Sequence, residues 1–405
     1  MDPVAAALAR LSEAQAKSAD ELEQLSSYHA TSSAWTIGGG IAAVVRLCYD
    51  PAAADDATAA LCNLSNTDGA NKRRMREAGA VPALVALLSG GPESEAAGRA
   101  ALLLSHLARG EASLVAITEA GTIPLLVGLL SGGPESDAVR RVALALANLT
   151  RNDADRAAII EAGAIPLLVA LLSGGPEAEA ADTAEHATAA LGNLASSEAN
   201  RDAITGAGAI PPLVALLSGG PESESAKKAA ATLGNLAYDS EASKAAIIGA
   251  GAIPPLVALL SGGPLLPSTR YAAGALINLA CNDANRAAII GAGAIPPLVA
   301  LLNGGAEARL AKEAARALGR LAHGATGVDV LEEVARTQTD CSSWQSLRDR
   351  LRRRASTRLQ AADGGTDVAA LERAITLATA VQVNAAALEH AQKRLWELNG
   401  DAERQ

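Results

Sequence analysis

A short phrase recurs along most of the chain at a nearly constant interval. It reads AGAVP at Ala78, AGTIP at Ala120 and then AGAIP four times, starting at Ala162, Ala207, Ala250 and Ala292. Consecutive starts at 78, 120, 162, 207, 250 and 292 are 42 to 45 residues apart. A second phrase, of the form LxNLA, keeps the same interval. A period of this length is typical of arrays of short helices, so the sequence predicts an all-α fold built from stacked repeats.

Residues 198–239 illustrate one repeat. The segment EANRDAITGAG predicts a short helix that ends at Gly206 and Gly208, since glycine tolerates the left-handed conformation found at helix ends. Pro211 and Pro212 predict the start of a second helix, because the first turn does not need their missing N–H groups. A third helix is expected to open at Pro221-Glu222 and to run to the LGNLA phrase. Three helices this short cannot bury their apolar faces alone, so neighbouring repeats are expected to stack.

The composition agrees with closely packed helices. Hydrophobic residues make up 49% of the 405 residues, but aromatic residues make up only 2%, and Phe is absent. A core of Ala, Leu, Val and Ile favours helices at close range over a β-sandwich, which prefers β-branched and aromatic pairs. Residues 245–269 carry no charge, but four prolines together with Gly262 and Gly263 argue against one membrane-spanning helix.

Charge and cysteine usage limit the expected partners and location. The formal net charge of −10 disfavours general nucleic-acid binding. The four cysteines are scattered and fit no metal-binding spacing, so we expect reduced thiols and no bound metal or cofactor. The N-terminal sequence lacks a secretory hydrophobic segment. Together these features predict a cytoplasmic or nuclear protein.

The phrase NRAAIIGAGAIPPLVALL, followed by a helix ending in LxNLA, resembles the armadillo repeat, and in particular the plant and fungal cytoplasmic armadillo proteins of the β-catenin-like superfamily. The resemblance covers residues 38–324 and implies a right-handed α-solenoid of about seven repeats, the first of them degenerate. Residues 1–37 are then expected to form a helical N-terminal cap. Residues 325–405 are expected to form a helical C-terminal region with a basic helix and a helical hairpin. The hairpin helices are expected at 367–380 and 385–398, and the second is expected to end at Asn399-Gly400.

One asparagine recurs at the same place on the predicted third helices. An Asn side chain offers both a donor and an acceptor, which suits it to pair with the backbone of an extended chain. In the family that the chain resembles, these residues line a concave groove and clamp a bound peptide. The alternative is that each Asn only satisfies backbone groups between repeats. The residues of this Asn ladder are Asn63, Asn148, Asn193, Asn235 and Asn278, and His106 and Arg320 interrupt it.

One turn before each Asn, family members that bind basic nuclear-localisation peptides carry Trp. This chain has none there, which disfavours import of basic cargo. About two turns before the Asn, basic residues recur, and a row of them is expected to attract an acidic or phosphorylated segment. The alternative is an ordinary solvated helix face. This basic row consists of Arg140, Arg141, Lys227, Lys228, Arg270 and Lys312.

The segment 346–362 contains six Arg and one Asp. It is interpreted as a helix that packs its leucines on the last repeat, as a helix that docks on an acidic membrane or on the chain's own acidic surface, or as a regulatory site. The third reading rests on Ser356, because Arg353-Arg354-Ala355-Ser356 resembles a basophilic kinase pattern.

No arrangement typical of catalysis is found, and the five histidines are dispersed. We therefore expect a non-enzymatic scaffold that acts as a monomer and binds an extended, acidic segment of a partner protein. Two alternatives remain open: the substrate-recognition subunit of a ubiquitin ligase, and a membrane-surface adaptor that uses the Arg-rich helix.

Overall fold

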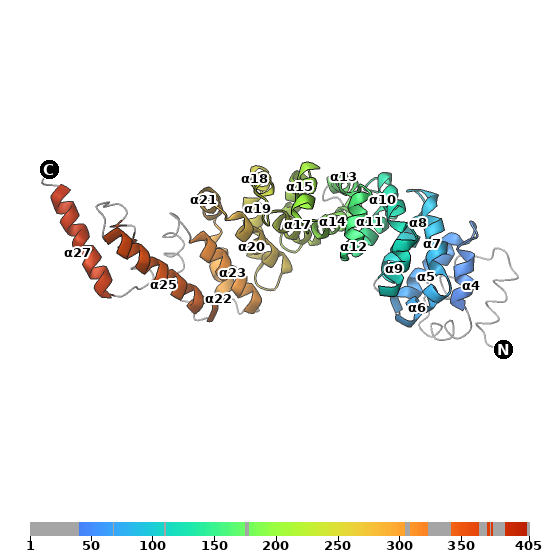
Figure 1. Cartoon of the computed structure of the whole chain (residues 1–405), viewed down its shortest axis with the longest axis horizontal. Helices are drawn as coiled ribbons and strands as arrows, with labels where there is room; N and C mark the ends of the chain where they lie inside the picture. Colours follow the sequence, from blue (N-terminus) through green and yellow to red (C-terminus); the bar gives the residue numbers. More distant parts are fainter. Residues whose placement is uncertain are drawn as a thin grey trace. The chain divides into compact units, whose positions relative to one another are not determined.

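A computed structural model describes most of the predicted repeat array and parts of the C-terminal region (Figure 1). The described residues are 40–67, 69–108, 111–174, 178–303, 308–322, 342–363, 371–372, 374–375 and 385–402. The predicted cap at 1–37 lies outside them. The chain divides into an N-terminal part, residues 1–212, and a C-terminal part, residues 213–405, and each is described by itself.

Six of the seven repeats contain the three helices that the sequence predicts, and the first repeat shows its second and third helices in the residues described. No strand occurs in these residues. The first helices are α6 (Gly69–Glu77), α9 (Glu111–Glu119), α12 (Asp153–Glu161), α15 (Glu198–Gly206), α18 (Glu241–Gly249) and α21 (Asp283–Gly291). The second helices are α4 (Gly40–Leu47), α7 (Ala80–Leu87), α10 (Thr122–Leu129), α13 (Ala164–Ala170), α16 (Ile210–Leu216), α19 (Ile253–Leu259) and α22 (Ile295–Asn303). The third helices are α5 (Ala54–Thr67), α8 (Glu95–Leu107), α11 (Asp137–Leu149), α14 (Ala178–Leu194), α17 (Glu224–Leu236), α20 (Pro267–Leu279) and α23 (Ala308–Leu321).

The recurring glycines turn the chain between the first and second helices. Gly163 has a φ of 76°, in the left-handed region that a side chain would disfavour. The axes of α12 and α13 on either side of it differ by 83°. An equivalent bend of 85° separates α18, which ends at Gly249, from α19, which begins at Ile253, so the apolar stretch 245–269 is no single helix.

Single turns of 3-10 helix follow five of the second helices, namely η1 (Leu88–Gly90), η2 (Leu130–Gly132), η3 (Leu171–Gly174), η4 (Leu217–Gly219) and η5 (Leu260–Gly262). The expected start of the third helix at Pro221-Glu222 is wrong by two residues. Helix α17 begins at Glu224, because the hydroxyl of Ser223 accepts a hydrogen bond from the backbone N–H of Ala226 and caps the helix. Ser94 and Ser136 cap α8 and α11 in the same way.

Small residues let the third helices pack closely. In the N-terminal part α5 packs against α8, α8 against α11 and α11 against α14, and in the C-terminal part α17 packs against α20 and α20 against α23. Gly98 on α8 marks one close approach, because a Cβ atom there would lie 2.6 Å from the Cα atom of Ala138 on α11. The buried surface is formed mainly by Ala and Leu, as the composition predicts.

The first helix of a repeat is tied to the end of the third helix before it. Asn200 and Asn285 donate from Nδ2 to the carbonyl oxygens of Leu194 and Leu279, at 2.9 Å and 3.0 Å. Asp155 takes the equivalent position on α12, where a carboxylate has no such proton to donate.

Asp155 is buried, and its surroundings satisfy it only in part. Oδ1 accepts a hydrogen bond from the hydroxyl of Thr118 at 2.8 Å, whereas Oδ2 has no hydrogen-bond partner among the described residues. Burial raises the pKa of Asp155, and the hydrogen bond from Thr118 opposes this only partly. The carboxyl group is therefore held toward its protonated form.

The C-terminal region is helical where it is described. The predicted basic helix is α25 (Ser342–Asp363), which packs against α23 and against α27 (Ala385–Ala402). The expected end of the last helix at Asn399-Gly400 is wrong, since α27 continues through both residues to Ala402. Of the expected helix 367–380, residues 371, 372, 374 and 375 are helical, and the others lie outside the described residues.

Two further findings concern the surface and the thiols. No single described helix is long and apolar enough to span a membrane, although four bent helix pairs meet the length and composition of a span. Cys48 and Cys62 are free and buried, and burial raises their thiol pKa values to about 12 and about 11. Both thiols are therefore protonated at neutral pH.

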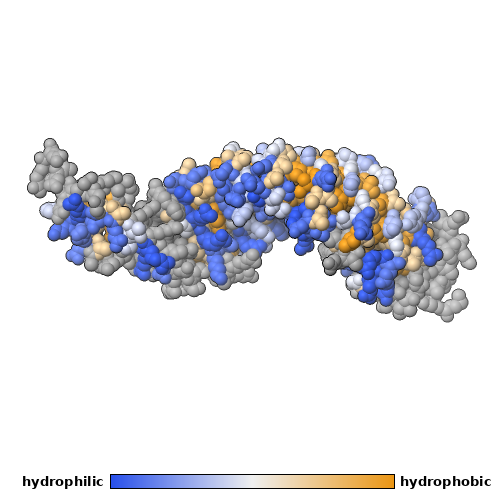
Figure 2. Space-filling view, viewed as in Figure 1, coloured by the Kyte–Doolittle hydropathy of each residue, from blue (hydrophilic) through white to orange (hydrophobic). Residues whose placement is uncertain are grey.

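On the face drawn in Figure 2, hydrophobic residues gather over α10 and α13.

Candidate functional site

The Asn ladder lies on one face of the third helices, with Asn63 on α5, Asn148 on α11, Asn193 on α14, Asn235 on α17 and Asn278 on α20. Because each third helix packs beside the next within each part of the chain, this register places the amides of each part along a common face. Asn63 and Asn235 are exposed, and the other three are half-buried. A ligand approaching this face would reach them directly.

Three of the ladder amides bind the preceding repeat. The Nδ2 of Asn148 donates to the hydroxyl of Ser105 at 3.3 Å, and the Nδ2 of Asn278 donates to the carbonyl oxygen of Gly234 at 2.9 Å. Asn193 donates to the carbonyl oxygen of Ala147 at 3.2 Å and to the hydroxyl of Thr150 at 3.1 Å. These contacts agree with the alternative reading, in which Asn joins repeats. Each amide also has a carbonyl oxygen that accepts hydrogen bonds, so the contacts leave room for a second role.

His106 interrupts the ladder in sequence but makes a comparable contact. Its Nδ1 lies 2.9 Å from the hydroxyl oxygen of Ser65, on the third helix of the preceding repeat. Ser65 follows Asn63 by two residues, just as Thr150 follows Asn148. His106 therefore replaces Asn as a link between repeats. Arg320, at the other interruption, is exposed on α23.

Three of the six residues of the basic row form ion pairs within the chain. Arg140 Nη2 lies 2.7 Å from an Asp137 carboxylate oxygen, and Arg141 Nη1 lies 2.6 Å from a Glu95 carboxylate oxygen across the repeat boundary. Lys227 pairs with Glu224. The hydrogen bond from Arg140 lowers the pKa of Asp137, so this carboxylate stays ionised. Lys228 also has an interaction partner.

The acidic partners have a common origin in the sequence. Glu95, Asp137 and Glu224 occupy the first turn of α8, α11 and α17, where a carboxylate also interacts favourably with the helix dipole. Helix α20 begins with Pro267 instead and has no acidic residue in its first turn. Within the described residues, neither Arg270 on α20 nor Lys312 on α23 forms an ion pair.

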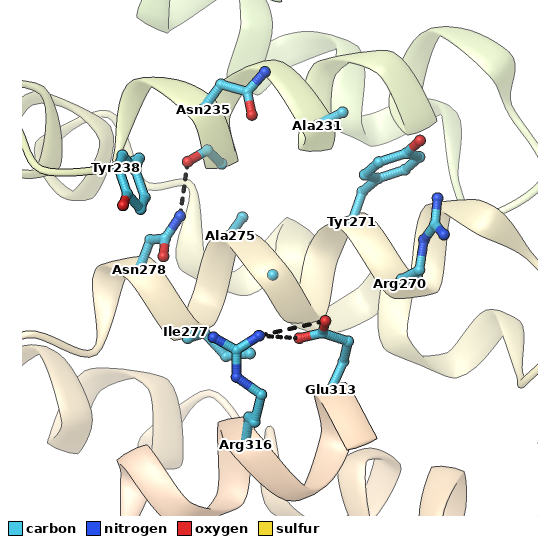
Figure 3. A pocket seen from close by; sticks show the side chains of 12 residues that line it. Ala231, Asn235, Tyr238, Arg270, Tyr271, Ala275, Ile277, Asn278, Glu313 and Arg316 are labelled. Carbon is cyan, nitrogen blue, oxygen red and sulfur yellow. Dashed lines mark hydrogen bonds and ion pairs between the residues drawn. The ribbon is translucent and has the colours of Figure 1, made fainter. Parts of the chain in front are cut away.

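A pocket of about 430 Å³ opens on this face between α17, α20 and α23 (Figure 3). Two ladder residues, Asn235 and Asn278, line it together with Arg270 of the basic row. We call it the tyrosine pocket, because Tyr238 and Tyr271 form its aromatic walls. Its other lining residues are Ala231, Gly234, Gly274, Ala275, Ile277, Glu313 and Arg316.

The charges in the tyrosine pocket are arranged by two contacts. The guanidinium carbon of Arg270 lies 4.8 Å from the centre of the Tyr271 ring, a cation–π contact. Arg316 Nη1 lies 3.1 Å and 3.4 Å from the two carboxylate oxygens of Glu313, one turn earlier on α23. Figure 3 shows these two groups on different sides of the pocket, with Tyr238 beside Asn278.

The sequence reasoning missed Tyr238, Tyr271, Glu313 and Arg316 as lining residues. A signal was present, because a chain with only four Tyr and no Phe places two of the four in adjacent repeats. Ser356, the predicted regulatory residue, is half-buried on α25. Among the residues that the structure describes, no group of three or more His, Cys, Asp or Glu side chains is arranged to hold a metal ion.

The comparisons with known proteins agree on the type of repeat. The family model described as the armadillo/β-catenin-like repeat matches residues 152–196, 197–238, 240–281 and 282–323. No curated protein matches the sequence.

Three of the solved structures that are similar to the chain illustrate the match. An engineered protein is 28% identical over 93% of this chain and 94% of its own, with a TM-score of 0.71. A designed armadillo repeat protein is 30% identical over 60% of this chain and 99% of its own, with a TM-score of 0.53. Computationally designed armadillo repeat proteins for modular peptide recognition are 27% identical over 59% and 99%, with a TM-score of 0.51. The repeats, their three-helix anatomy and these matches together show that the chain belongs to the armadillo/β-catenin-like repeat family.

Proposed function

We propose that this protein is a non-catalytic scaffold that binds an extended segment of a partner protein along its third helices. The observation that carries the proposal is the Asn ladder, whose amides share one register and remain accessible. The designed relative described as serving modular peptide recognition supports the same use of the fold. Repeat arrays generally bind through one surface that their units share.

The charge preference is proposed to depend on the C-terminal part of the array. Arg140, Arg141 and Lys227 are already paired with carboxylates of the chain. Arg270 and Lys312 have no such partner among the described residues. An acidic residue of a bound segment would therefore gain most beside these two. Binding is expected to weaken between low and physiological salt, because salt screens exposed charges.

The role of the basic helix is proposed to be structural. Ala355 and Leu359 of α25 are buried, and α25 packs against α23 of the last repeat. This arrangement supports a helix that covers the end of the array more than one that docks on a membrane. The protein is proposed to act in the cytoplasm or nucleus.

A direct test uses a displayed library of random peptides of about 12 residues, selected on the full-length chain. The affinity of the selected peptides is then measured for wild type and for Arg270→Ala, with Arg140→Ala as the matched control. The proposal predicts that acidic peptides lose affinity with Arg270→Ala and much less with Arg140→Ala. Selection of basic peptides, or equal losses for both variants, would contradict the proposed charge preference.

A further inference from the structure

The tyrosine pocket contains Gly274, and neither the backbone nor the packing explains why this residue is glycine. Gly274 lies inside α20, where a glycine is less favourable than an alanine. Its φ is not positive, and a Cβ atom built on it would meet no atom within 4 Å. Gly98 on α8 differs, since a Cβ atom there would collide with Ala138. Neither backbone conformation nor packing therefore requires glycine at position 274.

Other repeats show that a large side chain fits at this register. The equivalent residues one turn before the ladder position are Leu102 on α8 and Leu144 on α11. Both are half-buried in helices of the same length as α20. The glycine thus keeps open a space that leucine fills elsewhere in the array.

Aromatic surface is concentrated around that space. Two of the four tyrosines of the chain line this pocket, although aromatic residues are only 2% of the sequence. Tyr238 is 63% exposed, so much of its surface is open to a ligand. The Tyr271 ring is held by the guanidinium of Arg270. Rings pack against rings in offset or edge-to-face contacts, and guanidinium groups stack on rings.

The charges favour a neutral ring over an acidic side chain inside the pocket. Arg316 is already paired with Glu313, and the Glu313 carboxylate would repel an acidic group that entered. The volume of about 430 Å³ lies within the range of pockets that enclose a ligand group. Because Asn235 and Asn278 also line the pocket, a backbone held by these amides would pass directly beside it.

We propose that the tyrosine pocket is a specificity site that accepts one aromatic side chain of the extended partner segment. This inference rests on the proposed function, since the segment must first bind along the ladder. Under this proposal, the pocket between α17, α20 and α23 determines which partner segments bind. The acidic residues of the segment would then lie outside this pocket, near Lys312 and the outer side of Arg270.

The experiment uses the same displayed library of random peptides of about 12 residues, selected on the full-length chain. Gly274→Leu fills the pocket with the side chain that two sister helices already carry, so the variant should fold at least as well as wild type. Tyr238→Ala removes an exposed wall and provides a second variant. Ala189→Leu, at the same register on α14, is the matched control.

The expected result is that selected peptides share an aromatic residue at one position. Their affinity should fall about tenfold or more with Gly274→Leu and with Tyr238→Ala, the loss typical of an anchor residue. It should change little with Ala189→Leu, and the melting temperature of Gly274→Leu should not fall.

Three outcomes would overturn the inference. These are selection of peptides without an aromatic residue, enrichment of acidic or aliphatic residues at the position sensitive to Gly274→Leu, and equal binding of aromatic peptides to wild type and to both pocket variants. If such peptides still depend on the Asn ladder, only the pocket is misassigned. If no peptide is selected, or if binding does not depend on the ladder, the proposed function fails with it.

Discussion

A single side chain shows how one substitution changes the chemistry of a repeated position. Asn200 and Asn285 donate to the end of the preceding third helix, whereas Asp155 leaves one buried carboxylate oxygen without a hydrogen-bond partner in the described structure. Burial raises the pKa of Asp155. A raised pKa means that the folded state binds the proton more tightly than the unfolded state. The group therefore supports folding at low pH, and this support is lost as the pH rises through its folded pKa.

We predict that Asp155→Asn stabilises the protein at pH 7 by about 1–3 kcal/mol, because an unsatisfied buried group is replaced by a donor. The gain should shrink toward pH 4, where the protonated carboxyl itself donates. Urea unfolding of both proteins at the two pH values measures this. The mirror control is Asn200→Asp, which should lose stability at pH 7. A gain that is equal at both pH values would refute the assignment.

The sequence could not predict which groups the side chains of the Asn ladder bind. The register of the Asn ladder could be predicted from the repeat, but its amides donate to the preceding repeat at distances set by helix spacing. The ion pairs of the basic row depend in the same way on acidic residues in the first helical turn, such as Asp137 and Glu224, which lie three residues before Arg140 and Lys227. That spacing is visible in the sequence. It would have shown that part of the positive charge of the basic row is neutralised within the chain.

Gly98 and Gly274 both lie in third helices, but close packing requires glycine only at position 98. Gly98→Ala would place a Cβ atom 2.6 Å from the Ala138 backbone, and we predict a loss of about 1–3 kcal/mol from overpacking. Gly274→Ala meets no atom within 4 Å and should gain about 0.5–1 kcal/mol from helix propensity. Thermal unfolding of the two variants measures both. Effects of the same sign would contradict the packing described for α8 and α11.

Helix boundaries could be predicted where proline and glycine fix the backbone. Helix α15 ends at Gly206, as predicted, and α16 begins at Ile210, one residue before the predicted Pro211. The start of α17 was misplaced because Ser223, two residues after Pro221, provides the cap. The end of α27 was misplaced because the helix continues through Asn399 and Gly400. Neither residue type ends a helix by itself.

At the scale of the whole molecule, a repeat array is stabilised mainly by contacts between neighbours. Helix α25 packs against α23, so residues 325–405 should protect the last repeat. We predict that deleting these residues leaves the array helical but lowers the amide hydrogen-exchange protection of α23. Protection of α11, several repeats away, should be unchanged. A uniform loss along the array, or an unchanged α23, would contradict this role.

The repeat period carried most of what the sequence could establish about the whole molecule. It predicted stacked repeats of three helices, and the armadillo resemblance implied about seven of them. The family match, over four repeats, and the structure confirm the armadillo type. The tyrosine pocket could not be predicted in the same way, since its walls come from three helices whose contacts depend on stacking. Departures from the repeat, such as Gly274 and Tyr271, are therefore the positions where specificity is expected.

The central claim is that the Asn ladder binds a partner backbone. Its most direct test replaces Asn148, Asn193, Asn235 and Asn278 together with Ala and measures the affinity for selected peptides at a temperature where the variant is folded. Each hydrogen bond is worth about 0.5–1.5 kcal/mol, so the account predicts a loss of about 30-fold to more than 10⁴-fold. Stability should also fall, because three of these amides join repeats. The control, Asn200→Ala with Asn285→Ala, should lose stability but keep affinity. Unchanged affinity of the folded quadruple variant would contradict the account.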